Sequence, residues 1–146
     1  MKVLKAILAG FAGAAALNIL HETVRRFDSD APRVDLLGEE ALTKSMNSLN
    51  LEAPTGNRLY AATLAGDLVS NGIYYTTIAM SGSKNLYLKS AVAGLTAGLA
   101  AIKLPDKMGL DDKPVTKTDK TKALTVAWYL IGGLVTAAVF NRLNRD

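Results

Sequence analysis

Near its C-terminal end the chain reads ALTVAWYLIGGLVTAAVFN from Ala123 to Asn141, and none of these residues is charged. A helix needs about 20 mostly apolar residues to cross a bilayer, because it rises about 1.5 Å per residue and the hydrocarbon core is about 30 Å thick. A soluble helix of this length would carry a charged face opposite its apolar face. The stretch therefore predicts a membrane-spanning helix.

Three other parts of the chain are equally poor in charge. Ala6–His21 and Ser90–Ile102 contain no charged residue, and Leu59–Ser83 contains only Asp67. Charged residues instead collect in the segments between these stretches. The chain is therefore predicted to form four spanning helices, over residues 3–24, 59–80, 86–104 and 123–141.

The expected helix over 86–104 has the shortest uncharged centre. Lys89 and Lys103 would have to extend their ammonium groups to the two membrane surfaces. The alternative for the whole chain is a soluble four-helix bundle, in which each helix shows a charged face. The first, third and fourth segments lack such a face. This contrast favours an all-α integral membrane protein, a four-transmembrane-helix bundle forming a single membrane domain over residues 1–146.

The long connection between the first two spans should contain a further helix. Asp35 is placed to cap a helix over residues 36–49, in which apolar residues recur on one side. This pattern is typical of an amphipathic helix at the lipid headgroup level, and equally of a helix packed over the ends of the spanning helices. The connection over 105–121 lacks hydrophobic periodicity and is expected to be a solvated loop.

Composition excludes several kinds of chemistry. The chain has 17 Lys and Arg against 13 Asp and Glu, no cysteine, and His21 as its one histidine. Disulfides, thiolate zinc sites and multi-histidine metal sites cannot form within one chain. No phosphate-binding loop or nucleophile elbow is present, and no basic face interleaved with aromatic residues indicates nucleic acid. We expect no metal and no cofactor, and a non-enzymatic role is favoured.

Polar side chains interrupt the apolar stretches at two places. Asn18, His21 and Arg25 are spaced to lie on one side of the first helix. Asp67 lies about 12 Å into the second helix from the same membrane surface, close to the depth of about 9 Å for Asn18. An ionised carboxylate in a bilayer costs about 2.5 to 3.5 kcal/mol unless it is paired, protonated or facing water. The two groups are predicted to meet as one site, made of Asn18, His21, Glu22, Arg25, Asp67 and Asn71.

Two uses of this site remain open. A polar clamp would fix the register of the helices, whereas a pocket would bind a small ligand, a headgroup or a proton. In either case Asp67 is expected to face inward and to pair with Asn18 or His21. Arg25 is expected to reach down toward it from the membrane surface.

A second cluster of charge follows the first helix. Arg25, Arg26 and Arg33 are candidates for holding an anionic lipid headgroup. The aspartates between residues 28 and 35 can instead pair with these arginines, as mixed surface charges usually do. We favour pairing.

Small residues recur at four-residue spacing in the expected spans, which lets helix backbones approach closely in lipid. These stripes predict packing within the chain. A stripe left uncovered would build a homo-oligomer or bind another membrane protein. The stripes comprise Ala6, Gly10 and Ala14; Ala62, Gly66 and Ser70; Gly94 and Gly98; and Gly132, Gly133 and Thr136.

The sequence predicts a location and a class of function. The first helix is expected to be retained and not cleaved as a signal, in a plasma membrane of the bacterial inner-membrane type. The distribution of Lys and Arg predicts that the long loops face the cytoplasm. The favoured function is a self-associating or partner-binding membrane subunit or scaffold. The alternatives are an oligomeric channel or carrier for a small ion or metabolite, using the Asp/His/Arg cluster, and a membrane-embedded lipid-modifying enzyme.

Overall fold

The computed structural model describes residues 1–145, and within that range it contains helices and no strands. The all-α prediction is confirmed, and the four longest helices cover the four charge-poor stretches. The helices are α1 (Lys2–Val24), α2 (Val34–Ser48), α3 (Gly56–Met80), α4 (Leu86–Lys107), α5 (Lys113–Thr116) and α6 (Asp119–Leu143).

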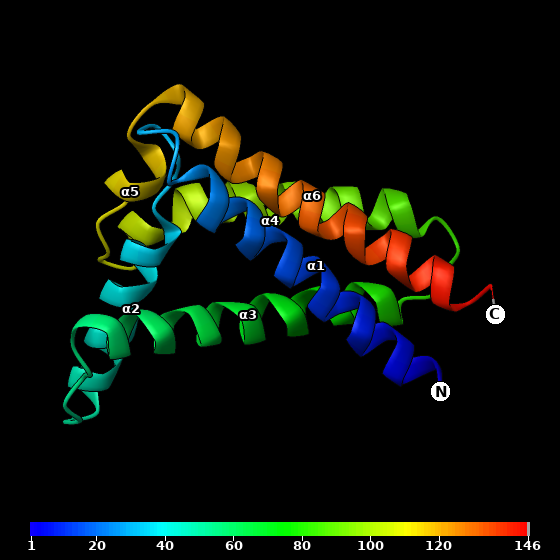
Figure 1. The fold of residues 1–146 in the computed structure, drawn as a ribbon, viewed down its shortest axis with the longest axis horizontal. Helices are drawn as coiled ribbons and strands as arrows, with labels where there is room; N and C mark the ends of the chain where they lie inside the picture. Colours follow the sequence, from blue (N-terminus) through cyan, green and yellow to red (C-terminus); the bar gives the residue numbers. More distant parts are fainter. Residues whose placement is uncertain (146) are drawn as a thin grey trace.

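The first helix of the chain holds the fold together. Helix α1 packs between α3 and α6, and α4 packs on α6. Helices α3 and α4 diverge from the turn that joins them, so they lie apart over much of their length (Figure 1). Both termini lie at the end of the molecule that carries this turn, and α2 and α5 lie at the opposite end (Figure 1).

Glycines allow the helix backbones to touch. A Cβ atom at Gly10 of α1 would lie 2.5 Å from Thr76 N and 2.7 Å from Gly72 O of α3. On α6, a Cβ atom at Gly133 would lie 2.5 Å from Ser90 O of α4. Any side chain at these positions would push two backbones apart. The predicted packing of small residues is therefore found at the α1–α3 and α4–α6 contacts.

Helix α3 does not use the small-residue stripe that the sequence suggested for packing. Ala62, Gly66 and Ser70 are exposed, and a Cβ atom at Gly66 would meet nothing within 4 Å. The helix packs on α1 through Gly72 and Thr76 instead. The reason is the divergence of α3 from α4, which leaves the Ala62–Ser70 side of α3 without a neighbouring helix.

The connection before α6 is more ordered than a solvated loop. It contains α5, whose Val115 is fully buried, and the Pro114 carbonyl accepts a hydrogen bond from the backbone N–H of Arg33. Helix α6 begins at Asp119, before its apolar run, because Thr118 and Thr121 form a capping box. The Thr118 hydroxyl accepts from Thr121 N at 3.0 Å, which satisfies a free donor of the first turn.

Helix α2 begins at Val34, and Asp35 does not cap it. The residue before the helix is Arg33, and no side chain caps this end. The Asp35 carboxylate turns toward the Arg33 guanidinium instead. Helix α2 packs against α3 and α5, which corresponds to the second of its two predicted positions, over the ends of the long helices.

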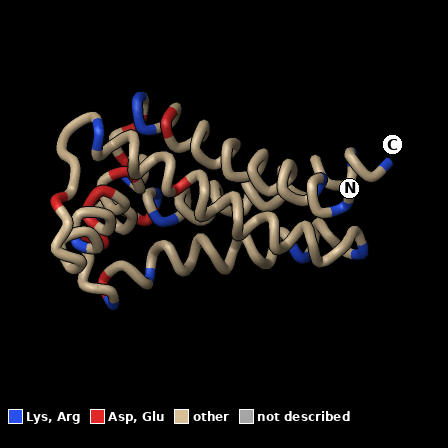
Figure 2. Tube along the Cα trace, turned by 90° about the horizontal axis from the view of Figure 1, so that it is seen from below, with Lys and Arg blue, Asp and Glu red and all other residues tan. Residues whose placement is uncertain are grey.

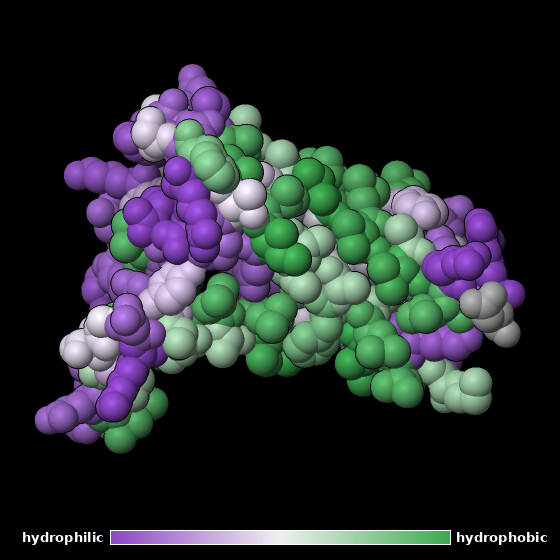
Figure 3. All heavy atoms as spheres, viewed as in Figure 1, coloured by the Kyte–Doolittle hydropathy of each residue, from purple (hydrophilic) through white to green (hydrophobic). Residues whose placement is uncertain are grey.

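Two helices, α1 and α6, are long and apolar enough to cross a membrane. Only 39% of the apolar window in each is buried inside the protein. Charged residues gather at the two ends of the molecule and leave the middle nearly free of charge (Figure 2). On the face seen in Figure 3, a broad apolar zone separates two hydrophilic ends.

Candidate functional site

The space between the diverging helices α3 and α4 forms a groove of about 820 Å³, called here the α3–α4 groove. Residues of α3 and α4 make its walls, residues of α1 and α6 make its floor, and α2 lines the end farthest from the termini. Ligand sites are typically about 300–1,000 Å³, mostly apolar, with a few converging polar groups. The α3–α4 groove has this size and this composition.

Small side chains keep the groove open. Gly66 and Ser70 line it from α3, and Ala97, Ala100 and Ala101 line it from α4. Larger side chains at these positions would fill the space. The exposed stripe of α3 is therefore one wall of the groove.

Two tyrosines close the groove toward the termini. The Tyr74 hydroxyl on α3 donates to the Ala93 carbonyl on α4 at 2.9 Å and ties the two walls together. The neighbouring Tyr75 hydroxyl donates to the Tyr129 carbonyl on α6 at 2.7 Å. Both bonds fix α3 at the point from which it diverges.

Asp67 lies in the wall of the groove, partly buried. Its Oδ1 accepts a hydrogen bond from Asn71 Nδ2, one turn along α3, at 2.9 Å. Asn18 and His21 of α1 line the same groove and lie near Asp67. The structure thus brings together the two polar groups that the sequence placed at similar depth.

Asp35 is the most strongly held carboxylate of the groove. Arg33 Nη2 lies 2.6 Å from its Oδ2 and Arg25 Nη1 lies 3.4 Å away. Burial alone would raise the pKa of Asp35, but the hydrogen bonds that Arg33 donates, together with the nearby imidazole of His21, outweigh burial and hold the pKa well below its usual value. Asp35 is therefore a fixed negative charge that ties α2 to the end of α1.

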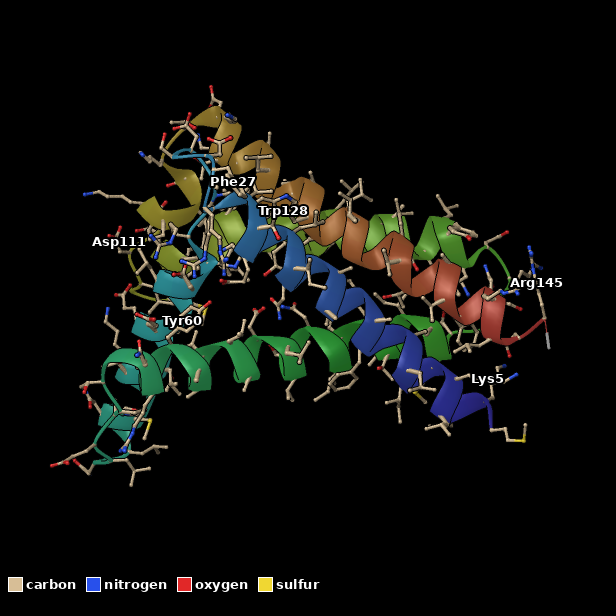
Figure 4. All side chains as sticks on the ribbon, in the orientation of Figure 1. Lys5, Phe27, Tyr60, Asp111, Trp128 and Arg145 are labelled. Atoms are coloured by element: carbon tan, nitrogen blue, oxygen red, sulfur yellow. The ribbon has the colours of Figure 1, made fainter. Side chains whose placement is uncertain are left out.

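His21 is buried between two carboxylates. Its Nδ1 lies 3.6 Å from Glu22 Oε1, and its Nε2 lies 3.6 Å from Asp35 Oδ1. Its ring centroid lies 5.8 Å from that of Trp128 on α6. Trp128, the one tryptophan of the sequence, lies on α6 beside His21 of α1 (Figure 4). Its fluorescence can therefore report changes at the part of the groove that His21 lines.

Buried polar atoms without hydrogen-bond partners concentrate at this groove. Across residues 1–145, five side chains carry such an atom, and four of them line the groove. Each atom of this kind costs about 1–3 kcal/mol, so native proteins keep few of them without a reason. The four are Asn18 Oδ1, His21 Nε2, Glu22 Oε1 and Thr63 Oγ1.

The groove lining is acidic. Its ionisable side chains include Glu22, Asp35 and Asp67, and no lysine or arginine of the described chain lines it. Glu22 is paired with Arg25 at 2.7 Å and Asp35 with Arg33. Asp67 makes no ion pair with a lysine or arginine of residues 1–145, so it is the carboxylate of this lining without a guanidinium partner.

Arg25 does not reach Asp67. Its guanidinium binds Glu22 and Asp35 and donates to the Tyr60 hydroxyl at 3.1 Å. These three partners hold Arg25 at the end of the groove that α2 lines. The expected set of six residues therefore divides into one group around Asp67 and a second group around Arg25, next to α2.

The three arginines considered for headgroup binding have different surroundings. Arg25 and Arg33 pair with acids, as mixed charges were expected to do, and the pKa of the Arg33 guanidinium is raised by its bond to Asp35. Arg26 makes no ion pair within the described range. The geometry thus leaves Arg26 alone available to an anion.

Sequence reasoning missed three groups of the groove. Asp35 was assigned to capping, and neither Tyr60 nor Thr63 was among the candidate site residues. Their recruitment depends on how α2 packs on α3, where Gly38 contacts Thr63, and no spacing within either helix indicates it. The closely spaced alanines 97, 100 and 101 could have indicated the groove, since they give α4 one face made only of small side chains.

Comparison with protein-family models, with curated proteins and with solved structures finds no match. Residues 1–145 also contain no group of three or more histidine, aspartate or glutamate side chains placed to hold a metal ion. The chemistry of the groove is therefore the basis for a functional proposal.

Proposed function

We propose that this chain is a small polytopic membrane protein that binds a membrane-dissolved amphiphile in the α3–α4 groove. In this proposal α1, α3, α4 and α6 all cross the bilayer, α2 lies at its surface, and the long loops face the cytoplasm. Helices α3 and α4 have 25 and 22 residues, enough for about 37 and 33 Å at 1.5 Å per residue.

Outward-facing apolar side chains support spanning by α3 and α4. Val69 and Ile73 on α3 and Val92 and Leu99 on α4 are about half exposed, and Leu88 on α4 is 66% exposed. A monomeric soluble protein rarely exposes so continuous an apolar surface, whereas lipid covers it without cost.

The absence of cysteine makes a labelling test of the location direct. Single cysteines at Val69, Val92 and the turn residue Ser83 are treated in intact membranes with a water-soluble maleimide. The proposal expects labelling at Ser83→Cys after the appropriate side is made accessible, and protection at Val69→Cys and Val92→Cys. Equal labelling rates at all three positions would show that α3 and α4 stand in water.

The concentration of unpartnered buried polar atoms at the groove carries the binding proposal. Four such atoms beside an otherwise apolar space of ligand size indicate a molecule with an apolar body and a polar end. The groove opens between two helices, so an amphiphile can enter it from the bilayer.

Filling the groove tests this function. Gly66→Leu adds a side chain where a Cβ atom meets nothing within 4 Å, so it occupies the groove without a clash. Ala65→Leu is the matched control, because Ala65 is exposed and does not line the groove. We expect lipids retained by the gently extracted protein, counted by native mass spectrometry, to be lost in Gly66→Leu and kept in Ala65→Leu. Retention in both variants would refute the groove as the binding site.

Self-association is a second candidate, favoured by the uncovered stripe Ala62, Gly66 and Ser70. A second helix could pack on this stripe as small-residue surfaces do in lipid. The same mass measurement gives the copy number. A dimer that becomes a monomer in Gly66→Leu, without loss of lipid, would favour a scaffold over a ligand-binding subunit. A carrier or a lipid-modifying enzyme must first bind its ligand, so the same binding test comes before any test of transport or turnover.

A further inference from the structure

The charge pattern of the groove points to the chemistry of its ligand. We propose that the α3–α4 groove selects amphiphiles with a protonated amine headgroup, which Asp67 binds, over those with an anionic headgroup. This inference rests on the proposed function of the groove and adds the class of ligand.

The first step is the sign of the charge. The lining contains three acidic side chains and no lysine or arginine from residues 1–145. A phosphate or carboxylate headgroup would lie beside the Asp67 carboxylate, and the guanidinium groups of Arg25 and Arg33 are already paired with Glu22 and Asp35. Like charges at close range in a poorly hydrated space repel strongly, so anionic amphiphiles are disfavoured.

The second step is which acid remains free to bind. Glu22 lies 2.7 Å from Arg25 Nη2, and Asp35 lies 2.6 Å from Arg33 Nη2. Asp67 accepts a hydrogen bond from Asn71, and its neighbour on α1, Asn18, is likewise a neutral amide. A carboxylate has two oxygens and about four acceptor positions, so Asp67 keeps capacity for a donor from a ligand.

The third step is the surroundings of Asp67. Asn18 Oδ1 and Thr63 Oγ1 are buried oxygen atoms without partners in residues that line the same space, and Ser70 lines it one turn from Asp67. An ammonium group has three donors and no acceptor, so it can donate both to the Asp67 carboxylate and to these unpartnered oxygen atoms. The small side chains of Ala97, Ala100 and Ala101 leave room for an alkyl chain beside it.

The test uses three probes with the same alkyl chain: tetradecylamine, tetradecanol and tetradecanoate. Binding to the full-length protein in mild detergent is followed by the fluorescence of Trp128, behind the groove floor. We expect the amine to bind about tenfold or more tightly than the alcohol, because a hydrogen bond to a charged group is stronger than a neutral one, and the carboxylate to bind most weakly.

Variants separate this inference from the proposed function. Asp67→Asn should lower amine affinity about tenfold and leave the affinity for tetradecanol within a factor of about two. Gly66→Leu should weaken all three probes, and Ala65→Leu none. If the three probes bind alike and Gly66→Leu removes them all, the groove is the site but the preference for an amine is wrong. If Gly66→Leu changes nothing, or no probe binds, the proposed function fails as well.

The comparison of probes on the unmodified protein needs no variant. It decides the matter even if Asp67→Asn does not fold. Tetradecanoate binding as tightly as tetradecylamine would overturn the inference.

Discussion

Replacing Gly94 by alanine should loosen the contact between α4 and α6, and the structure gives the size of the effect. A Cβ atom at Gly94 would lie 2.7 Å from Tyr129 O, 2.8 Å from Leu130 Cα and 3.2 Å from Leu130 N. All three are backbone atoms of α6, which cannot rotate away as the end of a side chain can.

Two terms of opposite sign decide the free energy of unfolding. Overpacking of this kind costs about 1–3 kcal/mol, and a purely backbone clash belongs near the upper value. Alanine is favoured over glycine inside a helix by about 1 kcal/mol. Gly94→Ala should therefore destabilise the protein by about 2 kcal/mol.

Gly66→Ala is the matched control. Gly66 also lies inside a long helix, but its Cβ atom would meet nothing within 4 Å, so only the favourable helix term remains. The assay is titration of the detergent-solubilised protein with sodium dodecyl sulfate, followed by Trp128 fluorescence. A Gly94→Ala variant within about 0.5 kcal/mol of the parent, or a Gly66→Ala variant less stable than Gly94→Ala, would refute the packing described for α4 and α6.

Two further predictions concern the end of the molecule that carries α2. Because the folded-state pKa of Asp35 is depressed, its contribution to stability is present above its unfolded pKa of about 3.9 and is lost as the pH falls below about 4. Asp35→Asn should remove this loss of stability at low pH, measured by thermal unfolding at a series of pH values. Asp106→Asn, at an exposed position, should retain it. An unchanged pH profile in Asp35→Asn would contradict the role of Asp35 as a stabilising charge. Thr118→Ala should cost about 1 kcal/mol in the same detergent titration through loss of the α6 cap, and Thr118→Ser, which keeps the hydroxyl, should cost much less; equal losses would show that the capping bond is not the cause.

The positions of the long helices could be predicted from the sequence because charge is expensive in an apolar interior. The gaps between charged residues located α1, α3, α4 and α6 to within a few residues. The start of α6 was placed too late, since its first turn, Asp119–Lys122, is polar and is held by the Thr118 capping box. That these four helices span a membrane stays a prediction, and of the four α1 and α6 alone are both long and apolar enough by composition.

The candidate site was only partly predictable. The spacing of Asn18 and His21 placed them on one face of their helix, and similar positions along the two helices brought Asp67 near them. The orientation of the Arg25 side chain could not be predicted from spacing, because its partners Asp35 and Tyr60 belong to other helices, α2 and α3. Small residues were equally ambiguous, since the same spacing serves a tight contact at Gly94 and an open wall at Gly66.

The order of contacts along the chain sets a schedule for assembly. Helix α3 can dock on α1 as soon as it is made, since the two are neighbours in the fold. Helix α4 turns back from α3 without packing along it, and its main partner, α6, is synthesised only after α5. The glycine face of α4 therefore stays uncovered until α6 has been made. In that interval a chaperone or an insertion factor would have the largest uncovered helix surface to bind.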